Sequence, residues 1–133
     1  MVSHLMFLWY TVKKLKSEAN KVFICDHVVG REELTVIAQS SFGDMVKGVV
    51  DTRRQLLALD AELHADLETM LLENGSAQSD LWGINLYPDE TDDFVEFDSL
   101  INIRPMQGNR SRGVEDPTIR DTILEVVSKW TEQ

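Results

Sequence analysis

The feature that most constrains the fold is the way in which short β-type runs come in pairs between helical stretches. Apolar runs at 45–51 and 55–61 are separated by only three polar residues, and this spacing predicts a β-hairpin. Runs at 81–87 and 94–103 are separated by an acidic turn and predict a second antiparallel hairpin. Hairpins joined by helices indicate an α+β protein with a mostly antiparallel sheet.

Three stretches, 31–42, 66–73 and 118–130, carry apolar residues at helical spacing. The last of them has the clearest start, because Asp116 is a good N-cap and Pro117 suits the first helical position. Each stretch has an apolar stripe that must be buried against another element. We therefore expect the helices to pack on one face of the sheet.

The predicted domain is a single α+β unit that spans residues 21–133, and residues 1–20 form an N-terminal extension. A first strand at 21–28 completes the element order β-α-β-β-α-β-β-α. The apolar run at 5–10 in the extension is too short to span a bilayer. A chain of 133 residues, of which 43% are hydrophobic, can bury a core as one domain.

The net charge and the cysteine content indicate which binding partners and which cellular compartment suit the protein. The net charge of -10 disfavours DNA and anionic lipid, so we expect neither DNA nor a membrane as a partner. Cys25 is the only cysteine, so no internal disulfide can form and a cytoplasmic location fits best. The sequence has no glycine-rich nucleotide loop, and we predict neither a cofactor nor a metal site.

Several blocks of the sequence are specific enough to carry a resemblance. They are SFGDMVK at 41–47, ELHAD at 62–66, LENGS at 72–76, DLWGINLYP at 80–88, FDSLINIRP at 97–105 and NRSR at 109–112. Through these blocks the chain resembles a family of short prokaryotic proteins of unknown function, over about three quarters of its length. The resemblance implies a stand-alone domain and brings no activity, ligand or catalytic residue.

Alternation along the predicted strand at 94–103 assigns its side chains to two faces. Phe94, Glu96, Asp98, Leu100, Asn102 and Arg104 share one face, and Val95, Phe97, Ser99, Ile101 and Ile103 point into the core. If Tyr87 pairs near Phe94, Asn85 lies beside Glu96 on the polar face. That face is open to three interpretations, namely a solvated surface, the floor of a binding site or a dimer interface.

An arginine-rich segment follows this strand and is the first candidate site. The candidate ligand-binding residues are Asn102, Arg104, Asn109, Arg110 and Arg112, together with Asp98. Guanidinium groups suit carboxylate and phosphate, and the helix start at Pro117 adds free backbone N–H groups.

Two observations oppose an anion site in this segment. Glu115 and Asp116 place negative charge where such a ligand would sit. In addition, the arginines can pair with the protein's own carboxylates, such as Glu62, Asp66 or Asp98. Both interpretations of the arginines remain open at the level of sequence.

The segment 62–66 is the second candidate. As an extended strand it points Glu62, His64 and Asp66 to one side, where carboxylate and imidazole could perform acid–base chemistry. We therefore take His64 and Glu62 as candidate catalytic residues, with His64 as general base. As a first helical turn, the same segment would instead make Asp66 a helix cap and His64 a structural residue.

Together these observations predict a small cytoplasmic protein that binds a small anionic or phosphate-bearing ligand. Hydrolysis or transfer, with His64 as the base, would be a further step. The alternative is a non-enzymatic module for protein interaction or oligomerisation, such as a homodimer, in which the same charged residues form networks.

Overall fold

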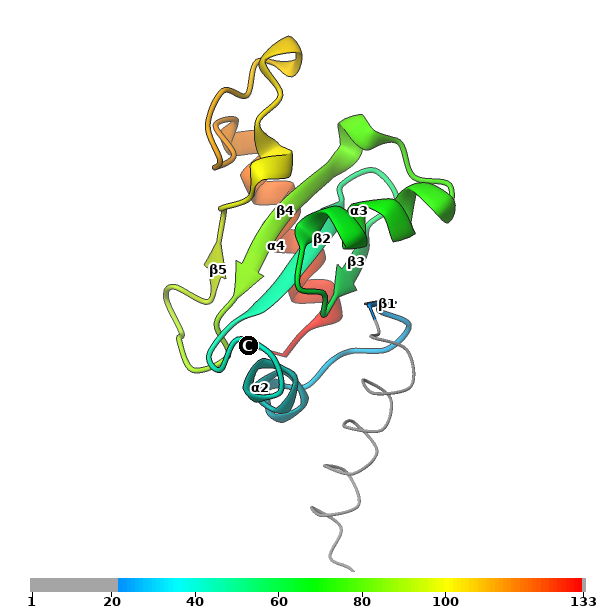
Figure 1. Ribbon diagram of the computed structural model, residues 1–133. Helices are drawn as coiled ribbons and strands as arrows, with labels where there is room; N and C mark the ends of the chain where they lie inside the picture. Colours follow the sequence, from blue (N-terminus) through cyan, green and yellow to red (C-terminus); the bar gives the residue numbers. More distant parts are fainter. Residues whose placement is uncertain (1–21, 133) are drawn as a thin grey trace, which may run out of the picture.

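The strands form one antiparallel sheet in the order β1-β3-β2-β4-β5 (Figure 1). A computed structural model of the protein describes residues 22–132, so the predicted extension at 1–20 lies outside the described residues. The strands are β1 (Phe23–Ile24), β2 (Val46–Asp51), β3 (Leu56–Leu59), β4 (Leu81–Leu86) and β5 (Val95–Glu96). The α-helices within this part of the chain are α2 (Arg31–Gln39), α3 (His64–Glu73) and α4 (Pro117–Trp130). The predicted α+β class and element order are confirmed.

β2 is the centre of the sheet because it pairs with a strand on each side. It forms the predicted hairpin with β3, from Gly48 opposite Leu59 to Asp51 opposite Leu56. On its other side it pairs with β4 along its whole length. The valines of β2 suit such a strand, since both of its edges are hydrogen-bonded and both of its faces are covered.

Helices cover both faces of the sheet, so the prediction that they all pack on one face is wrong. α3 packs Leu67 and Leu71 against Val49 on one face. α2 and α4 cover the opposite face, where Val50 belongs to the larger core cluster. Figure 1 shows α3 in front of the sheet and α4 behind it. The physical reason is that the central strands are apolar on both sides, so each side must be shielded from water.

The second hairpin is shorter than predicted. β5 ends at Glu96, and the chain continues through 3-10 turns at Leu100–Asn102 and Pro105–Gln107. The predicted alternation therefore fails. Ser99 and Asn102 were expected on opposite faces but are both buried, and Leu100, which was expected on the same face as Asn102, is exposed. The Ser99 side chain accepts a hydrogen bond from the Ile101 N–H, which favours the turn over a continued strand.

The helix ends follow capping chemistry only in part. α4 begins as predicted, with Asp116 Oδ1 accepting the Thr118 N–H at 2.8 Å and Pro117 in the first position. α3 begins two residues earlier than predicted, at His64, after Leu63 as an N-cap without a side-chain hydrogen bond. Asp66 lies inside the first turn and is not the cap.

Gly83 allows the turn after β5 to lie directly on β4. A Cβ at this position would stand 2.4 Å from Ser99 Cβ and 3.2 Å from Ile101 Cγ1. Ser99 is almost completely buried and therefore has no room to move away. The glycine in the middle of this strand is thus explained by a close approach of two segments and not by a turn.

We expect Gly83→Ala to lower the free energy of unfolding by about 1–3 kcal/mol, because the new methyl group overpacks the contact with Ser99. Urea unfolding followed by circular dichroism measures this loss. Gly30→Ala is the matched control, since its φ of -70° suits alanine and its nearest neighbour would stand at 3.4 Å. A control change within about 1 kcal/mol is expected. An equal effect of both substitutions would contradict the explanation.

Candidate functional site

A row of polar side chains crosses three neighbouring strands on the face that α3 covers. Lys47 of β2 lies opposite Asn85 of β4, and Asn85 lies opposite Glu96 of β5. We call Lys47, Asn85 and Glu96 the polar row. The pairing of Asn85 with Glu96 confirms the register expected from the sequence, and the Tyr87 N–H donates to the Phe94 carbonyl at 2.9 Å as that register requires.

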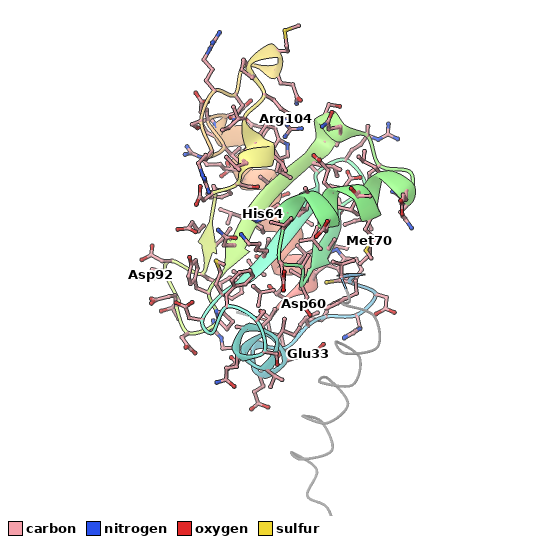
Figure 2. All side chains as sticks on the ribbon, in the orientation of Figure 1. Glu33, Asp60, His64, Met70, Asp92 and Arg104 are labelled. Carbon is pink, nitrogen blue, oxygen red and sulfur yellow. The ribbon has the colours of Figure 1, made fainter. Side chains whose placement is uncertain are left out.

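His64 lies at the N-terminal end of α3 beside the polar row, and its side chain is buried (Figure 2). Its Nε2 is 2.8 Å from the carbonyl oxygen of Ile84. A carbonyl can only accept, so Nε2 carries the proton and Nδ1 carries the lone pair of the neutral ring. Burial is the main cause that lowers the pKa of His64, and Lys47 lowers it further.

Three neighbouring groups act in the opposite direction and raise the pKa of His64. The Ile84 carbonyl, the Asn85 side chain and the Asp98 carboxylate each raise the pKa of His64, but burial outweighs them. The imidazole is therefore neutral at pH 7 and is able to take up a proton. His64 and Asp98, which are 34 positions apart in the sequence, are near enough to interact.

Asn85 has an acceptor atom without a partner. Its Nδ2 donates to Glu96 Oε1 at 2.8 Å and to the Asp98 carbonyl at 3.3 Å, and these two acceptors fix the orientation of the amide. Its Oδ1 is buried and has no hydrogen-bond partner among residues 22–132 while His64 is neutral, and hydrogen bonding between the protonated His64 ring and the Asn85 side chain is one of the causes that raise the pKa of His64. Only 4% of Asn85 is exposed. An unpaired buried acceptor is costly, and the donor nearest to it is the His64 ring once that ring is protonated.

Glu96, at the exposed end of the polar row, accepts two hydrogen bonds through one carboxylate oxygen. Its Oε1 accepts from Asn85 Nδ2 and also from the Tyr87 hydroxyl at 3.1 Å. The pKa of Tyr87 is raised by burial first and by this carboxylate second. Tyr87 therefore remains a neutral donor, and its bond helps to fix the Glu96 carboxylate.

Asp98 and Arg112 form a two-pronged ion pair next to this group. Arg112 Nε donates to Asp98 Oδ1 at 2.6 Å and Arg112 Nη2 donates to Asp98 Oδ2 at 3.3 Å. The pair is about half exposed, and hydrogen bonding to Asp98 raises the pKa of Arg112. The sequence left open whether the arginines bind a ligand or pair with carboxylates of the protein. In the structure Arg112 pairs with a carboxylate of the protein.

Asn102 uses its side chain in place of a strand. Its Oδ1 accepts the Gly83 N–H at 2.8 Å, and its Nδ2 donates to the Gly83 carbonyl at 3.0 Å and to the Arg112 carbonyl at 2.9 Å. A primary amide offers one acceptor and two donors here, so it mimics a backbone peptide beside β4. Asn102 is fully buried and is committed to the fold.

Arg104 and Asn109 are also committed to the fold. The Arg104 guanidinium lies 4.1 Å from the centre of the Trp82 ring and donates to the carbonyls of Gln78 and Leu81. Asn109 Nδ2 donates to the Asn102 carbonyl at 2.7 Å. Arg104 donates to the first residue of β4, whereas His64 contacts the Ile84 carbonyl further along that strand, and Figure 2 shows the two side chains apart.

The backbone N–H groups of the arginine-rich segment already bind a carboxylate of the protein itself, that of Glu115. Glu115 Oε2 accepts the N–H groups of Arg110 and Ser111, at 2.5 and 3.0 Å, and these bonds lower the pKa of Glu115. The Arg110 side chain is exposed, and the described residues offer it no hydrogen bond or ion pair. Glu62 is exposed as well and makes no contact of these kinds with His64 within residues 22–132.

Lys47 is the residue of the polar row that the sequence interpretation did not include. It lies directly opposite Asn85, and its ammonium group lies 5.2 Å from the centre of the Phe42 ring. No carboxylate in the described part of the chain pairs with it. The sequence did contain a sign of this polar face. Lys47 and Asp51 are separated by an even number of positions, so they share one face of a strand whose other residues are apolar or glycine.

The protein is a small α+β protein, and the polar row that forms its candidate site lies on an antiparallel sheet. The chain belongs to the family described as a protein of unknown function, DUF5674, which matches residues 23–130. This confirms the resemblance stated from the sequence. No curated protein and no solved structure matches the chain.

Among residues 22–132, no helix has the length and apolar character that crossing a membrane requires. The same residues contain no group of three or more His, Cys, Asp or Glu side chains that could hold a metal ion.

We expect Asn102→Asp to lower the free energy of unfolding by about 3–5 kcal/mol. The substitution removes the Nδ2 donor and faces the carbonyls of Gly83 and Arg112 with a buried carboxylate. Asn74→Asp is the matched control, because the exposed Asn74 side chain only accepts, from Arg54 Nη2. Its effect should stay below about 1 kcal/mol. Equal losses in urea unfolding would contradict the role of Asn102.

The neutral state of His64 has a consequence for stability. Its pKa is lowered from the ordinary 6.5, so below pH 6.5 the unfolded chain binds a proton that the folded protein does not. Stability therefore falls as the pH drops from 6.5 toward the folded-state pKa. We expect His64→Gln to reduce this fall, since glutamine does not titrate and can still donate to Ile84.

Urea unfolding at pH 7.5 and pH 5.5 measures the effect. His27→Gln is the control with the opposite sign, because hydrogen bonding to Asp26 raises the pKa of His27. The stabilisation from His27 is complete below pH 6.5 and is lost as the pH rises. His27→Gln should therefore leave the acid loss in place, and an unchanged acid loss in His64→Gln would show that His64 is not the group responsible.

Proposed function

We propose that the protein binds a small anionic ligand on the polar row and that His64 accepts a proton from the bound molecule. The observation that carries the proposal is the group formed by Lys47, Asn85 and His64, in which Lys47 lies opposite Asn85 and both side chains act on the imidazole. The orientation of the Asn85 amide is fixed by Glu96 and Asp98.

Two features favour negative charge on the ligand. Lys47 stands beside Asn85 without a carboxylate partner in the described residues. In addition, α3 begins next to the polar row, and its N-cap, Leu63, makes no side-chain hydrogen bond. The N-terminal end of a helix carries partial positive charge and N–H groups, both of which favour anions. Asp66 in the first turn reduces this effect, but its side chain is exposed to solvent.

His64 has the state that a general base requires. Its ring is held by the Ile84 carbonyl, and burial keeps it neutral with a lone pair on Nδ1. A ligand hydroxyl or a water molecule could transfer its proton to this nitrogen. Hydrolysis or group transfer would then be the reaction of the bound anion. The role that the sequence gave to Glu62 does not belong to this proposal, because Glu62 lies exposed without a described contact to His64.

Thermal shift with inorganic phosphate, phosphate esters and carboxylic acids tests the proposal. A ligand at 100 times its Kd adds about 2.7 kcal/mol of stability, which corresponds to a rise of several degrees in Tm. We expect Lys47→Met to abolish most of this rise. Lys129→Met is the control, since Lys129 lies in α4 and donates to the side chain of Gln55.

Either of two results would overturn the proposal. The first is that no compound stabilises the protein. The second is that Lys47→Met and Lys129→Met reduce the shift equally. If no compound binds and light scattering shows association that weakens with added salt, the interaction module is the better description of the protein.

A further inference from the structure

Charged side chains lie on each of the elements beside the His64 ring. They are Lys47 of β2, Glu96 of β5, Asp98 and Arg112 of the segment that follows β5, Asp66 of α3 and Glu62 just before that helix. Lys47 lowers the pKa of His64, and Asp98 raises it. Asp98 is already paired with Arg112, whereas Lys47 is only partly buried and has no carboxylate partner within residues 22–132. The charge of Lys47 is therefore the influence on His64 that an anion from solution can change.

The His64 ring has an acceptor in place for a second N–H group. Nε2 donates to the Ile84 carbonyl at 2.8 Å, so a proton taken up from solution binds to the lone pair on Nδ1. Asn85 Oδ1 is buried without a partner while the ring is neutral, and hydrogen bonding to Asn85 favours the protonated ring. Both oxygens of Asp98 already accept from Arg112. The amide oxygen is thus the unpaired acceptor that a protonated ring would satisfy.

We propose that an anion bound at Lys47 causes His64 to take up a proton, and that the new N–H group donates to Asn85 Oδ1. This inference rests on the proposed function and specifies how the same site is regulated. The anion offsets the positive charge of Lys47, which otherwise opposes the imidazolium. The ring thus becomes a stronger base when the ligand is in place, whether the proton comes from water or from the ligand.

Proton uptake and anion binding are then linked, so each strengthens the other. Burial and Lys47 hold the pKa of the free ring below 6.5, and the anion raises it, so the affinity for the anion increases as the pH falls from 7.5 toward 5.5. We expect sulfate to bind at least about 3-fold more tightly at pH 5.5 than at pH 7.5 in isothermal titration calorimetry. His64→Gln should remove this difference, and His27→Gln should retain it.

An NMR titration of the histidine rings measures the proton directly on the unaltered protein. Sulfate and oxalate are the probes, because neither takes up protons between pH 5.5 and 7.5. Each replaces chloride at constant ionic strength, so that general screening does not change. We expect both anions to raise the pKa of His64. His27 is the internal control, since its exposed ring is bonded to Asp26 and should keep its pKa.

Lys47→Met tests the link without any ligand. Loss of the ammonium group removes the same repulsion that the anion offsets, so the pKa of His64 in the free variant should rise, and sulfate should not raise it further. Lys129→Met is the matched control, because Lys129 lies in α4 and donates to Gln55, and it should leave the pKa of His64 unchanged. Circular dichroism checks that both variants fold, and the titration of the unaltered protein depends on neither.

The outcomes distinguish this inference from the function on which it rests. Sulfate or oxalate that binds without raising the pKa of His64 would overturn the inference and leave anion binding in place. An unchanged pKa of His64 in Lys47→Met would overturn it as well. If neither probe binds, the inference is wrong, and the proposed function is wrong too only if no compound in the thermal-shift screen stabilises the protein.

Discussion

The structure depends on one side-chain amide that takes the place of a strand. Asn102 exchanges hydrogen bonds with both backbone groups of Gly83, so β4 remains paired after β5 has ended. Because the amide occupies this edge, the rest of the arginine-rich segment must fold over it, and Asn109 holds that segment through the Asn102 carbonyl. The same arrangement brings Asp98 beside Asn85, which completes the polar surroundings of His64.

The elements that the sequence predicts well are those whose signals are local. The start of α4 follows directly from Asp116 and Pro117, and the neighbouring positions of Asn85 and Glu96 follow from the hairpin register. The extension of the second strand to residue 103 fails because alternation cannot reveal that a buried side chain, Asn102, does the pairing. The two-sided cover of the sheet was also missed, since an apolar run such as 81–86 indicates burial without showing what buries it.

For the candidate site, the sequence did not show which partners the polar residues have. The density of arginine and asparagine between 102 and 112 indicated a ligand, whereas Asn102, Arg104 and Asn109 are held by the protein's own backbone. These interactions join distant segments and leave no periodic trace in the sequence. His64 was identified, but its neighbour is Asn85 on another strand and not Glu62, which lies two positions away.

On the edge of β4 that faces away from β2, side chains form hydrogen bonds with backbone groups that β5 does not reach. The Leu81 carbonyl accepts from Arg104, both backbone groups of Gly83 are taken by Asn102, and Asn85 lies opposite β5. An unpaired strand edge is a template on which another chain can add a strand, and proteins must guard against it. Here two polar side chains provide that protection over most of the strand. The residues that first looked like a binding loop thus occupy the part of the β4 edge that β5 leaves uncovered, where another chain could otherwise add a strand.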